Sequence, residues 1–495
     1  MVKSIVTFSD IIFYWHINDC KEECEKYYIY LDGERVGTTD KTHFTLRNIK
    51  KCTADVKIYT DEKGTNLFYS EFFTLPLKPR FIDVSKEPYN AGGDNAAHNI
   101  KAIQKAIDDC REGECVYFPK GLYVTGALNL HSNMEVYVEA GAEIKGSEDP
   151  LLYLPRIWSR FEGKEMECYS SLINLGNIKD REGIACENVI IHGGGKIFGG
   201  GRPLAENVIE SERKRLEADP DFKYDSECEN NNTIPGRVRP KLINISCAKN
   251  VVIDNIELGY GSCWNLHMIY SKDIVTCNCR FESFGVWNGD GWDPDSSENC
   301  SLFNCEFSTG DDCVAIKSGK NPEGNVIAKP CKNINVFDCR ATNGHGVAIG
   351  SEMSGGVSDI FVWDCDFEKT MSGIEIKATK KRGGYVKNIY MTRCRVPRVL
   401  MHAVGYNDDG IAAPTVPSFS DCRFENITIT GLARKYNSEE FAPCGAITLR
   451  GFDDNHKVEN IYFNNVTIDN GNDSVMQTLS FQTLKNINIT NLNVK

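Results

Sequence analysis

Three aspartates and a histidine lie in short, glycine-containing segments whose residue types suit acid–base chemistry. The segments are Asn288-Gly289-Asp290, Gly310-Asp311-Asp312 and Gly344-His345-Gly346. When carboxyl groups are crowded, at least one pKa rises, so that a protonated acid can stand beside ionised bases. Hydrolysis of a glycosidic bond requires that division, because one carboxyl protonates the leaving oxygen while another activates water or attacks carbon.

Taken singly, each aspartate is also an ordinary turn residue or a calcium ligand, because Asp beside Gly is common in turns. The functional interpretation depends on whether the segments stack. The strands that follow them, and a fourth at residues 373–377, align so that apolar side chains point inward and the other positions point outward. The three outward columns are Asp290, Asp312, His345 and Ser372; Asp293, Ala315, Ala348 and Glu375; and Asp295, Lys317, Gly350 and Lys377.

A sequence repeat indicates that the segments do stack. An Asn or Asp followed by alternating apolar residues recurs at intervals of 23 to 38 residues, at Asn250, Asp273, Asn299, Asn333, Asp359, Asn388, Asn426, Asn460 and Asn486. Six residues after each marker comes a small or apolar side chain: Ile256, Cys279, Cys305, Cys339, Cys365, Cys394, Leu432, Val466 and Leu492. This regularity is typical of a right-handed parallel β-helix, in which equivalent side chains stack from coil to coil.

Stacked coils lie roughly 4.8 Å apart. Asp290, Asp311 and Asp312 are therefore expected to crowd near His345, on a groove that the small residues Ala315 and Ala348 leave open. The buried cysteines read as an internal apolar ladder, because a buried thiol behaves as a small hydrophobe. A metal or redox site is the alternative for them.

The pattern over the whole chain predicts an all-β protein of two domains. Residues 1–82 alternate polar and apolar residues in short strands around turn signals, which predicts a small β-sandwich similar to a fibronectin type III domain. Residues 83–495 are assigned to the β-helix. A helix is predicted over 94–110, with Asp94 or Asn95 as its cap, and the polar stretch 199–240 is predicted to be a long surface excursion.

Composition excludes several functional classes. The chain has 495 residues and a formal net charge of −13, which disfavours nucleic acid or an anionic membrane surface as the partner. We identify no signal peptide at Met1–Asp10, and the 21 cysteines suit a reducing compartment. These features predict a cytoplasmic protein, with a secreted protein given without its leader as the alternative. No metal or organic cofactor is implied, and the oligomeric state stays open.

The three segments resemble, in order, the signature motifs of glycoside hydrolase family 28, the polygalacturonases. The resemblance covers about residues 83–495, and Ser159–Gly163 and Arg239–Ile243 also look like segments of bacterial members. It implies a β-helix and an inverting mechanism, with Asp311 as general acid and Asp290 and Asp312 positioning and deprotonating the water. His345 would tune or orient the acid. The substrate-binding candidates are Asn288, Arg160, Lys317, Glu375 and Lys377.

One position departs from the family pattern. The fourth family motif, Arg-Ile-Lys, binds a galacturonate carboxylate, whereas this chain has Glu375-Ile376-Lys377. A carboxylate at 375 would repel an acidic sugar where an arginine would bind it. Lys377 and the nearby Lys380, Lys381 and Arg382 could still attract one.

The resemblance predicts exo-action on pectin-derived oligosaccharides that contain galacturonate. An alternative in the same family is release of a neutral sugar, such as rhamnose, xylose or apiose, because Glu375 replaces the arginine. A more distant alternative is a polysaccharide lyase or a non-catalytic carbohydrate-binding β-helix. The expected partner is an oligosaccharide or glycoside.

Overall fold

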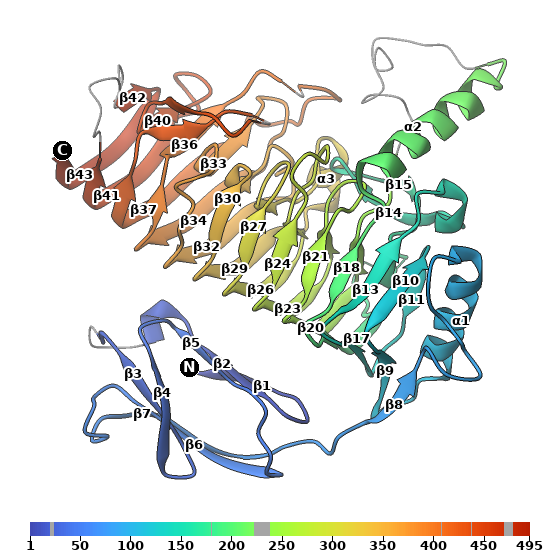
Figure 1. Ribbon diagram of the computed structural model, residues 1–495. Coiled ribbons are helices and arrows are strands. Elements are labelled where there is room, and N and C mark those ends of the chain that lie inside the picture. Colours follow the sequence, from blue (N-terminus) through green and yellow to red (C-terminus); the bar gives the residue numbers. More distant parts are fainter. Residues whose placement is uncertain (20–23, 180, 222–237, 407, 437, 470–478) are drawn as a thin grey trace. The chain divides into compact units, whose positions relative to one another are not determined.

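The computed structural model describes residues 1–19, 24–179, 181–221, 238–406, 408–436, 438–469 and 479–495. The chain divides into two compact units, Met1–Arg80 and Phe81–Lys495, which are described separately (Figure 1). Within the described residues no helix is both long and apolar enough to cross a membrane.

The first unit is a small antiparallel β-sandwich, as predicted. One sheet has the order β1-β2-β5 and the other β4-β3-β6-β7. The strands are β1 (Lys3–Val6), β2 (Ile11–Tyr14), β3 (Tyr27–Leu31), β4 (Glu34–Thr39), β5 (His43–Leu46), β6 (Thr53–Tyr59) and β7 (Leu67–Thr74). Phe13 and Leu46 from one sheet pack with Ile29, Val56 and Phe73 from the other, which gives the unit a core of its own.

The second unit is a parallel β-helix built from three long sheets (Figure 1). The sheet that carries the predicted acidic residues has the order β11 (Leu128–Leu130), β16 (Ile173–Gly176), β19 (Ile243–Ser246), β22 (Leu266–Ile269), β25 (Trp292–Asp295), β28 (Val314–Ile316), β31 (Gly346–Ile349), β33 (Gly373–Ala378), β36 (Arg398–Ala403), β40 (Ile447–Arg450) and β42 (Leu479–Gln482). We call it the groove sheet. Its neighbouring strands all pair in parallel.

The other two sheets complete each coil. The shorter one contains β10 (Gly121–Thr125), β13 (Ala142–Gly146), β18 (Lys196–Phe198), β21 (Glu257–Gly259), β24 (Arg280–Glu282), β27 (Glu306–Ser308) and β30 (Arg340–Asn343). The longer one contains β8 (Arg80–Asp83), β9 (Glu114–Phe118), β12 (Met134–Val138), β17 (Cys186–His192), β20 (Ala248–Asp254), β23 (Lys272–Cys277), β26 (Glu298–Phe303), β29 (Cys331–Phe337), β32 (Val357–Trp363), β34 (Tyr385–Thr392), β35 (Arg395–Val396), β37 (Ser418–Ile429), β41 (Val458–Ile468) and β43 (Leu484–Val494).

The Asn and Asp markers of the repeat have a physical role at the corners of the coils. All of them have a φ between 53° and 61°, in the left-handed region that Asn and Asp tolerate best among residues with a Cβ. Their side chains also form a ladder: Asn299 Nδ2 donates to Asp273 (3.1 Å), and Asn333 Nδ2 donates to Asn299 (2.7 Å). The repeat therefore fixes where each coil turns.

One marker of the predicted repeat is wrong. In the ladder Asn460 donates to Asp421, not to Asn426, and Cys422 pairs with Ile461. The inward residue of that coil is accordingly Ile427, which is buried, whereas the predicted Leu432 is 37% exposed. Asn426 misled the alignment because it belongs to a second ladder, in which Asn465 donates to it.

The predicted cysteine ladder lies inside the coil. Cys279, Cys305, Cys339, Cys365 and Cys394 are all buried, none more than 4% exposed. Each thiol donates to the carbonyl oxygen two residues earlier, at 3.1–3.4 Å. Burial raises the pKa of these thiols from Cys305 onward, so they are protonated, apolar packing elements.

The β-helix unit contains two longer helices, one predicted from the sequence and one not. The predicted first helix is α1 (Ala96–Asp109), and Asn95 caps it by accepting from the His98 amide at 3.2 Å. The second, α2 (Gly201–Glu217), was missed, because its polar composition was interpreted as a surface excursion. The apolar side chains Leu204, Val208 and Leu216 are buried at helical spacing. Residues 222–237 of that excursion lie outside the described residues.

Two antiparallel elements and two further short helices complete the unit. The strands are β14 (Ile157–Phe161) paired with β15 (Lys164–Cys168), and β38 (Leu432–Arg434) paired with β39 (Phe441–Pro443). The helices are the 3-10 turn Pro150–Tyr153 and α3 (Glu323–Ile327). The β14–β15 hairpin and α2 are tied together at Glu212, which accepts from Tyr169 at 2.9 Å and from Arg156.

Candidate active site

The register of the groove sheet brings the predicted acidic positions into columns. Trp292 pairs with Val314, Val314 with Val347, and Val347 with Ile374. All four side chains are fully buried, so the positions two residues earlier share one column. These are Asp290, Asp312, His345 and Ser372. The structure therefore has the alignment that the sequence predicts.

Asp311, Asp312 and His345 form the first cluster of the site. The Nδ1 atom of His345 lies 3.0 Å from Oδ1 of Asp311 and 3.1 Å from Oδ1 of Asp312. Burial disfavours a charged ring, but the hydrogen bonds to Asp311 and Asp312 outweigh it and raise the pKa of His345 to about 10. An imidazolium therefore joins the side chains of two consecutive aspartates near neutral pH.

Asp312 is ionised near neutral pH. Burial alone would raise its pKa, but the nearby Lys377 ammonium and the His345 ring lower the pKa to about 2. The Asp311 side chain is the more accessible of the two, with 20% of it exposed against 9% for Asp312. The three ligand atoms lie within 4.8 Å of one another, a spacing that a cation could use. A protonated imidazole has no lone pair for a metal, which disfavours that use here.

Asp290 and Asp293 form the second cluster, around one lysine. The Nζ atom of Lys317 donates to Oδ2 of Asp290 at 2.9 Å and lies 3.1 Å from Oδ1 of Asp293. It also lies 4.1 Å from the centre of the Trp264 ring. Asp293 is fully buried, and Asp290 and Lys317 nearly so. Burial raises the pKa of Asp290, and the ammonium of Lys317 only partly opposes that rise.

Glu375 and Lys377 of β33 form the third cluster with His402 of β36. Oε1 of Glu375 lies 2.7 Å from Nε2 of His402, and Oε2 lies 3.4 Å from the Lys377 amine. Burial would raise the pKa of Glu375, but the His402 hydrogen bond and the Lys377 charge lower the pKa to about 2. The cluster therefore presents an ionised carboxylate beside Asp312. Tyr406, which is 51% exposed, lies in electrostatic range of Glu375 and Lys377.

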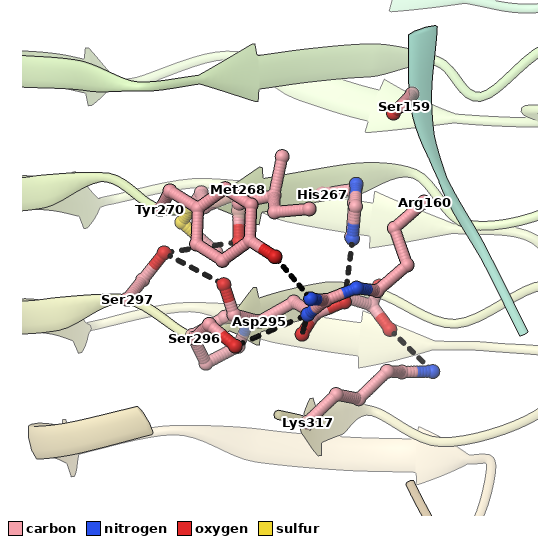
Figure 2. Close-up of polar contacts among 12 residues, drawn as sticks. Ser159, Arg160, His267, Met268, Tyr270, Asp295, Ser296, Ser297 and Lys317 are labelled. Atoms are coloured by element: carbon pink, nitrogen blue, oxygen red, sulfur yellow. Dashed lines mark hydrogen bonds and ion pairs between the residues drawn. The ribbon is translucent and has the colours of Figure 1, made fainter. Parts of the chain in front are cut away.

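Arg160 is not accessible to a ligand, in contrast to its predicted role as a substrate-binding residue. The side chain is fully buried, and Nη1 donates to Oδ1 of Asp295 at 2.5 Å and to Oγ of Ser296 at 3.1 Å, as Figure 2 shows. Nη2 donates to the Tyr270 hydroxyl. The physical reason is the β14–β15 hairpin, which packs against the outward side chains of β22 and β25 and covers them.

The hairpin turns part of the outward column into a buried polar network. Asp295 also lies 3.3 Å from Nε2 of His267, and Nδ1 of that ring lies 3.2 Å from Asn244 (Figure 2 shows the His267 contact). The Lys241 amine donates to Ser159 and to the Arg160 carbonyl, at 3.0 and 2.9 Å. Burial and the Lys241 charge lower the pKa of His267 to about 3, so its ring is neutral. This network holds the hairpin to the groove sheet.

Asn288 has a local partner within the protein. Its Oδ1 accepts from Nη2 of Arg239 at 2.7 Å, and its φ of 47° lies in the left-handed region. The side chain therefore shapes the turn that leads to Asp290, and whether it also contacts substrate stays a prediction. Trp292 does point inward, where its Nε1 donates to Thr276 at 3.1 Å.

Sequence reasoning missed two members of the site. The sequence places Asp293 in an outward column with Ala315, Ala348 and Glu375, but no role is predicted for it. His402 pairs in register with Lys377, but its strand precedes a long, irregular coil that ends at Arg450 in the next strand of the sheet, so no column included it. Beside His345 the surface is hollowed by a shallow pocket, lined by Phe284, Thr309, Met371, Arg434 and Tyr436 among others.

Carboxyl groups clustered on one face of a parallel β-helix are the groups that hydrolysis of a glycosidic bond requires. Residues 182–488 match the family described as "Glycosyl hydrolases family 28", and the chain belongs to this family. It is therefore a glycoside hydrolase related to the polygalacturonases.

Relatives of known name are similar over much of the chain. A "Probable polygalacturonase" of Vitis vinifera is 30% identical over 315 residues, which are 60% of this chain and 57% of that protein. The "Exo-poly-alpha-D-galacturonosidase" of Dickeya chrysanthemi is 24% identical over 81% of this chain and 67% of its own length. The match thus covers less than two thirds of the grapevine protein.

The fold of the whole chain also has a close structural counterpart. The structure of the Yersinia enterocolitica family 28 exopolygalacturonase superimposes with a TM-score of 0.80 at 21% identity, over 100% of this chain and 98% of that one. At this identity the comparison supports the fold, including the small β unit before the β-helix.

Proposed function

We propose that the groove hydrolyses a glycosidic bond in a pectin-derived oligosaccharide, with inversion of configuration and by exo-action. One observation carries the proposal. Three carboxyl groups, those of Asp290, Asp311 and Asp312, lie on adjacent rungs beside the imidazolium of His345. Inverting hydrolysis needs one carboxyl to protonate the leaving oxygen and others to hold and deprotonate a water.

The clusters support a division of roles. Asp311 is proposed as the general acid, because it is the more exposed carboxyl beside His345 and can reach the leaving oxygen. Asp312, with its pKa of about 2, is ionised at any working pH and can accept a hydrogen bond from the attacking water. Asp290 faces the same space from the preceding rung and is proposed to position and deprotonate that water with it. His345 orients the two aspartates of its cluster.

The direct test is the Asp311→Asn variant. The amide keeps the size of the side chain but cannot protonate the leaving oxygen, so turnover should fall by about 10²–10⁴-fold while the fold is retained. Unchanged turnover in this variant would overturn the assignment. A lyase would release an unsaturated product that absorbs in the ultraviolet, and a non-catalytic binding protein would release no product.

A neutral sugar next to Glu375 is the second candidate specificity. The favouring observation is that His402 and Lys377 keep Glu375 ionised, and a carboxylate repels the carboxylate of a uronic acid but accepts hydrogen bonds from hydroxyl groups. Lys377 is the opposing feature, because its ammonium favours an acidic sugar. Hydrolysis of digalacturonate compared with glycosides of neutral sugars separates the two.

A further inference from the structure

The carboxylate of Asp293 has an unusual environment behind the groove. It is fully buried, and within the described part of the chain neither of its oxygens, nor Oδ1 of Asp290, receives a hydrogen bond from a donor group. The Lys317 ammonium is the one cation at ion-pair distance from both carboxyls among these residues, at 2.9 Å from Asp290 and 3.1 Å from Asp293. The two carboxyl groups therefore share one positively charged partner.

Two ionised carboxylates around one ammonium leave a net negative charge in a buried place, which is unfavourable. One proton bound between the two carboxyls removes that charge and supplies the missing donor. Burial raises the pKa of Asp293 to about 6, a rise that the Lys317 charge opposes. Burial also raises the pKa of Asp290 well above its usual value.

The other charged groups around the pair do not supply a second counter-charge at contact distance. From β22, His267 pairs in register with Asp293, but its ring is neutral at a pKa of about 3. Arg160 of β14 is held by Asp295 of β25, and the Lys241 amine by Ser159 and Arg160. Asp311, Asp312 and Glu352 add negative charge from the following rungs.

We infer that Asp290 and Asp293 share one proton above the Lys317 ammonium, and that Asp293 is a positioning residue that sets the proton affinity of Asp290. The inference rests on the proposed role of Asp290 at the attacking water. It gives Asp293 a function that its buried position would otherwise not suggest. A carboxyl that never meets the substrate adjusts the pH range in which Asp290 can accept a proton.

The test is the pH profile of kcat/KM for the Asp293→Asn variant. Removing the second carboxylate leaves the whole Lys317 charge to Asp290, so the pKa of Asp290 falls. The acid limb should move to lower pH by about one unit or more. Lys317→Met should move the acid limb to higher pH, because Asp290 loses the positive charge that favours its ionised form. Glu352→Gln is the matched control, since it removes a carboxyl near Lys317 but outside the pair, and its limb should stay nearly in place.

A uniform loss of kcat/KM in Asp293→Asn, with the acid limb unmoved, would indicate a merely structural role and overturn the inference. If that variant does not fold, infrared spectra of the Glu352→Gln protein decide the matter. The carbonyl band of a protonated carboxylic acid should persist near pH 7, and its absence would also overturn the inference. Failure of the proposed function is a different result, namely hydrolysis that survives Asp311→Asn.

Discussion

Glu375 and His402 face each other across the neighbouring strands β33 and β36, with Oε1 of the carboxylate 2.7 Å from Nε2 of the ring. The contact explains how a glutamate is tolerated where the polygalacturonase motif has an arginine. Lys377 supplies positive charge beside the buried carboxylate, and His402 contacts it at hydrogen-bond distance. We therefore expect substrate selectivity at this rung to depend on three side chains and not on position 375 alone.

Replacing Glu375 by Gln should shift the selectivity toward acidic sugars. The amide removes the repulsion and frees Lys377 to bind a carboxylate, so kcat/KM for digalacturonate should rise relative to a neutral glycoside by about tenfold, equivalent to 1.4 kcal/mol. Competition between the two substrates measures the ratio. Lys377→Met is the opposing variant and should lower it. An unchanged ratio in both variants would show that the sugar beside Glu375 does not contact this cluster.

The imidazolium of His345 should be essential for turnover. In His345→Gln one of the charges that keep Asp312 ionised is lost, although Lys377 remains, so the pKa of Asp312 rises from about 2 and the acid limb of the rate profile moves to higher pH. Turnover should fall by about 10²-fold or more. Because the pKa of His345 is about 10, the wild-type enzyme should show no loss of activity from this ring between neutral pH and pH 9. A loss of activity with a midpoint near 6.5, the ordinary pKa of histidine, would contradict the contacts of His345 with Asp311 and Asp312.

Protonation of Glu375 and Asp312 should lower the stability of the folded protein at acidic pH. Their folded-state pKa values of about 2 lie below the ordinary values of 4.5 and 3.8. Their contribution is therefore present above the unfolded pKa and is lost as the pH falls toward 2. The unfolding temperature measured from pH 6 down to pH 3 should fall less steeply in Glu375→Gln than in the wild type. Parallel slopes would refute this contribution.

Much of the site could be predicted from the sequence because strand alternation and the repeat are local signals. Val314, Val347 and Ile374 fix which neighbours point outward, so the column of Asp290, Asp312 and His345 followed directly. The role of Arg160 could not be predicted in this way. Whether its side chain meets substrate or Asp295 depends on how the β14–β15 hairpin folds over another part of the chain, and no periodicity carries that information.

The last coils were harder for a different reason. The interval between markers varies with the loops at the corners, and Asn426 satisfies the repeat pattern although Asp421 occupies the ladder position. His402 lies just before this irregular region and was missed. The helix α2 was missed because charged residues fill its exposed face, which hides the buried spacing of Leu204, Val208 and Leu216.

Breaking the Arg160–Asp295 pair should destabilise the fold more than removing an exposed ion pair. Arg160→Met leaves Asp295 buried and without its main counter-charge, which costs about 3–5 kcal/mol. Arg340→Met is the matched control, because Arg340 pairs with Glu306 at the surface, where 69% and 47% of the two side chains are exposed, and it should cost about 1 kcal/mol or less. Denaturant unfolding compares the two variants. Equal losses would mean that Arg160 does not hold the hairpin.

The buried cysteines of the ladder should not react with thiol reagents in the folded protein. Cys339 and Cys365 are buried with raised pKa values, so a thiol reagent should label them only after unfolding, whereas the exposed Cys52 should react at once. Mass spectrometry of the labelled peptides measures this. Rapid labelling of Cys339 in the native protein would contradict its packing inside the coil.

The central claim is inverting hydrolysis by the aspartates of the groove, and the anomeric configuration of the first product tests it most directly. Proton NMR during cleavage of an α-linked galacturonide oligosaccharide should show the β-anomer forming first, with the signal abolished in Asp311→Asn. Initial release of the α-anomer, or an unsaturated product, would contradict the account.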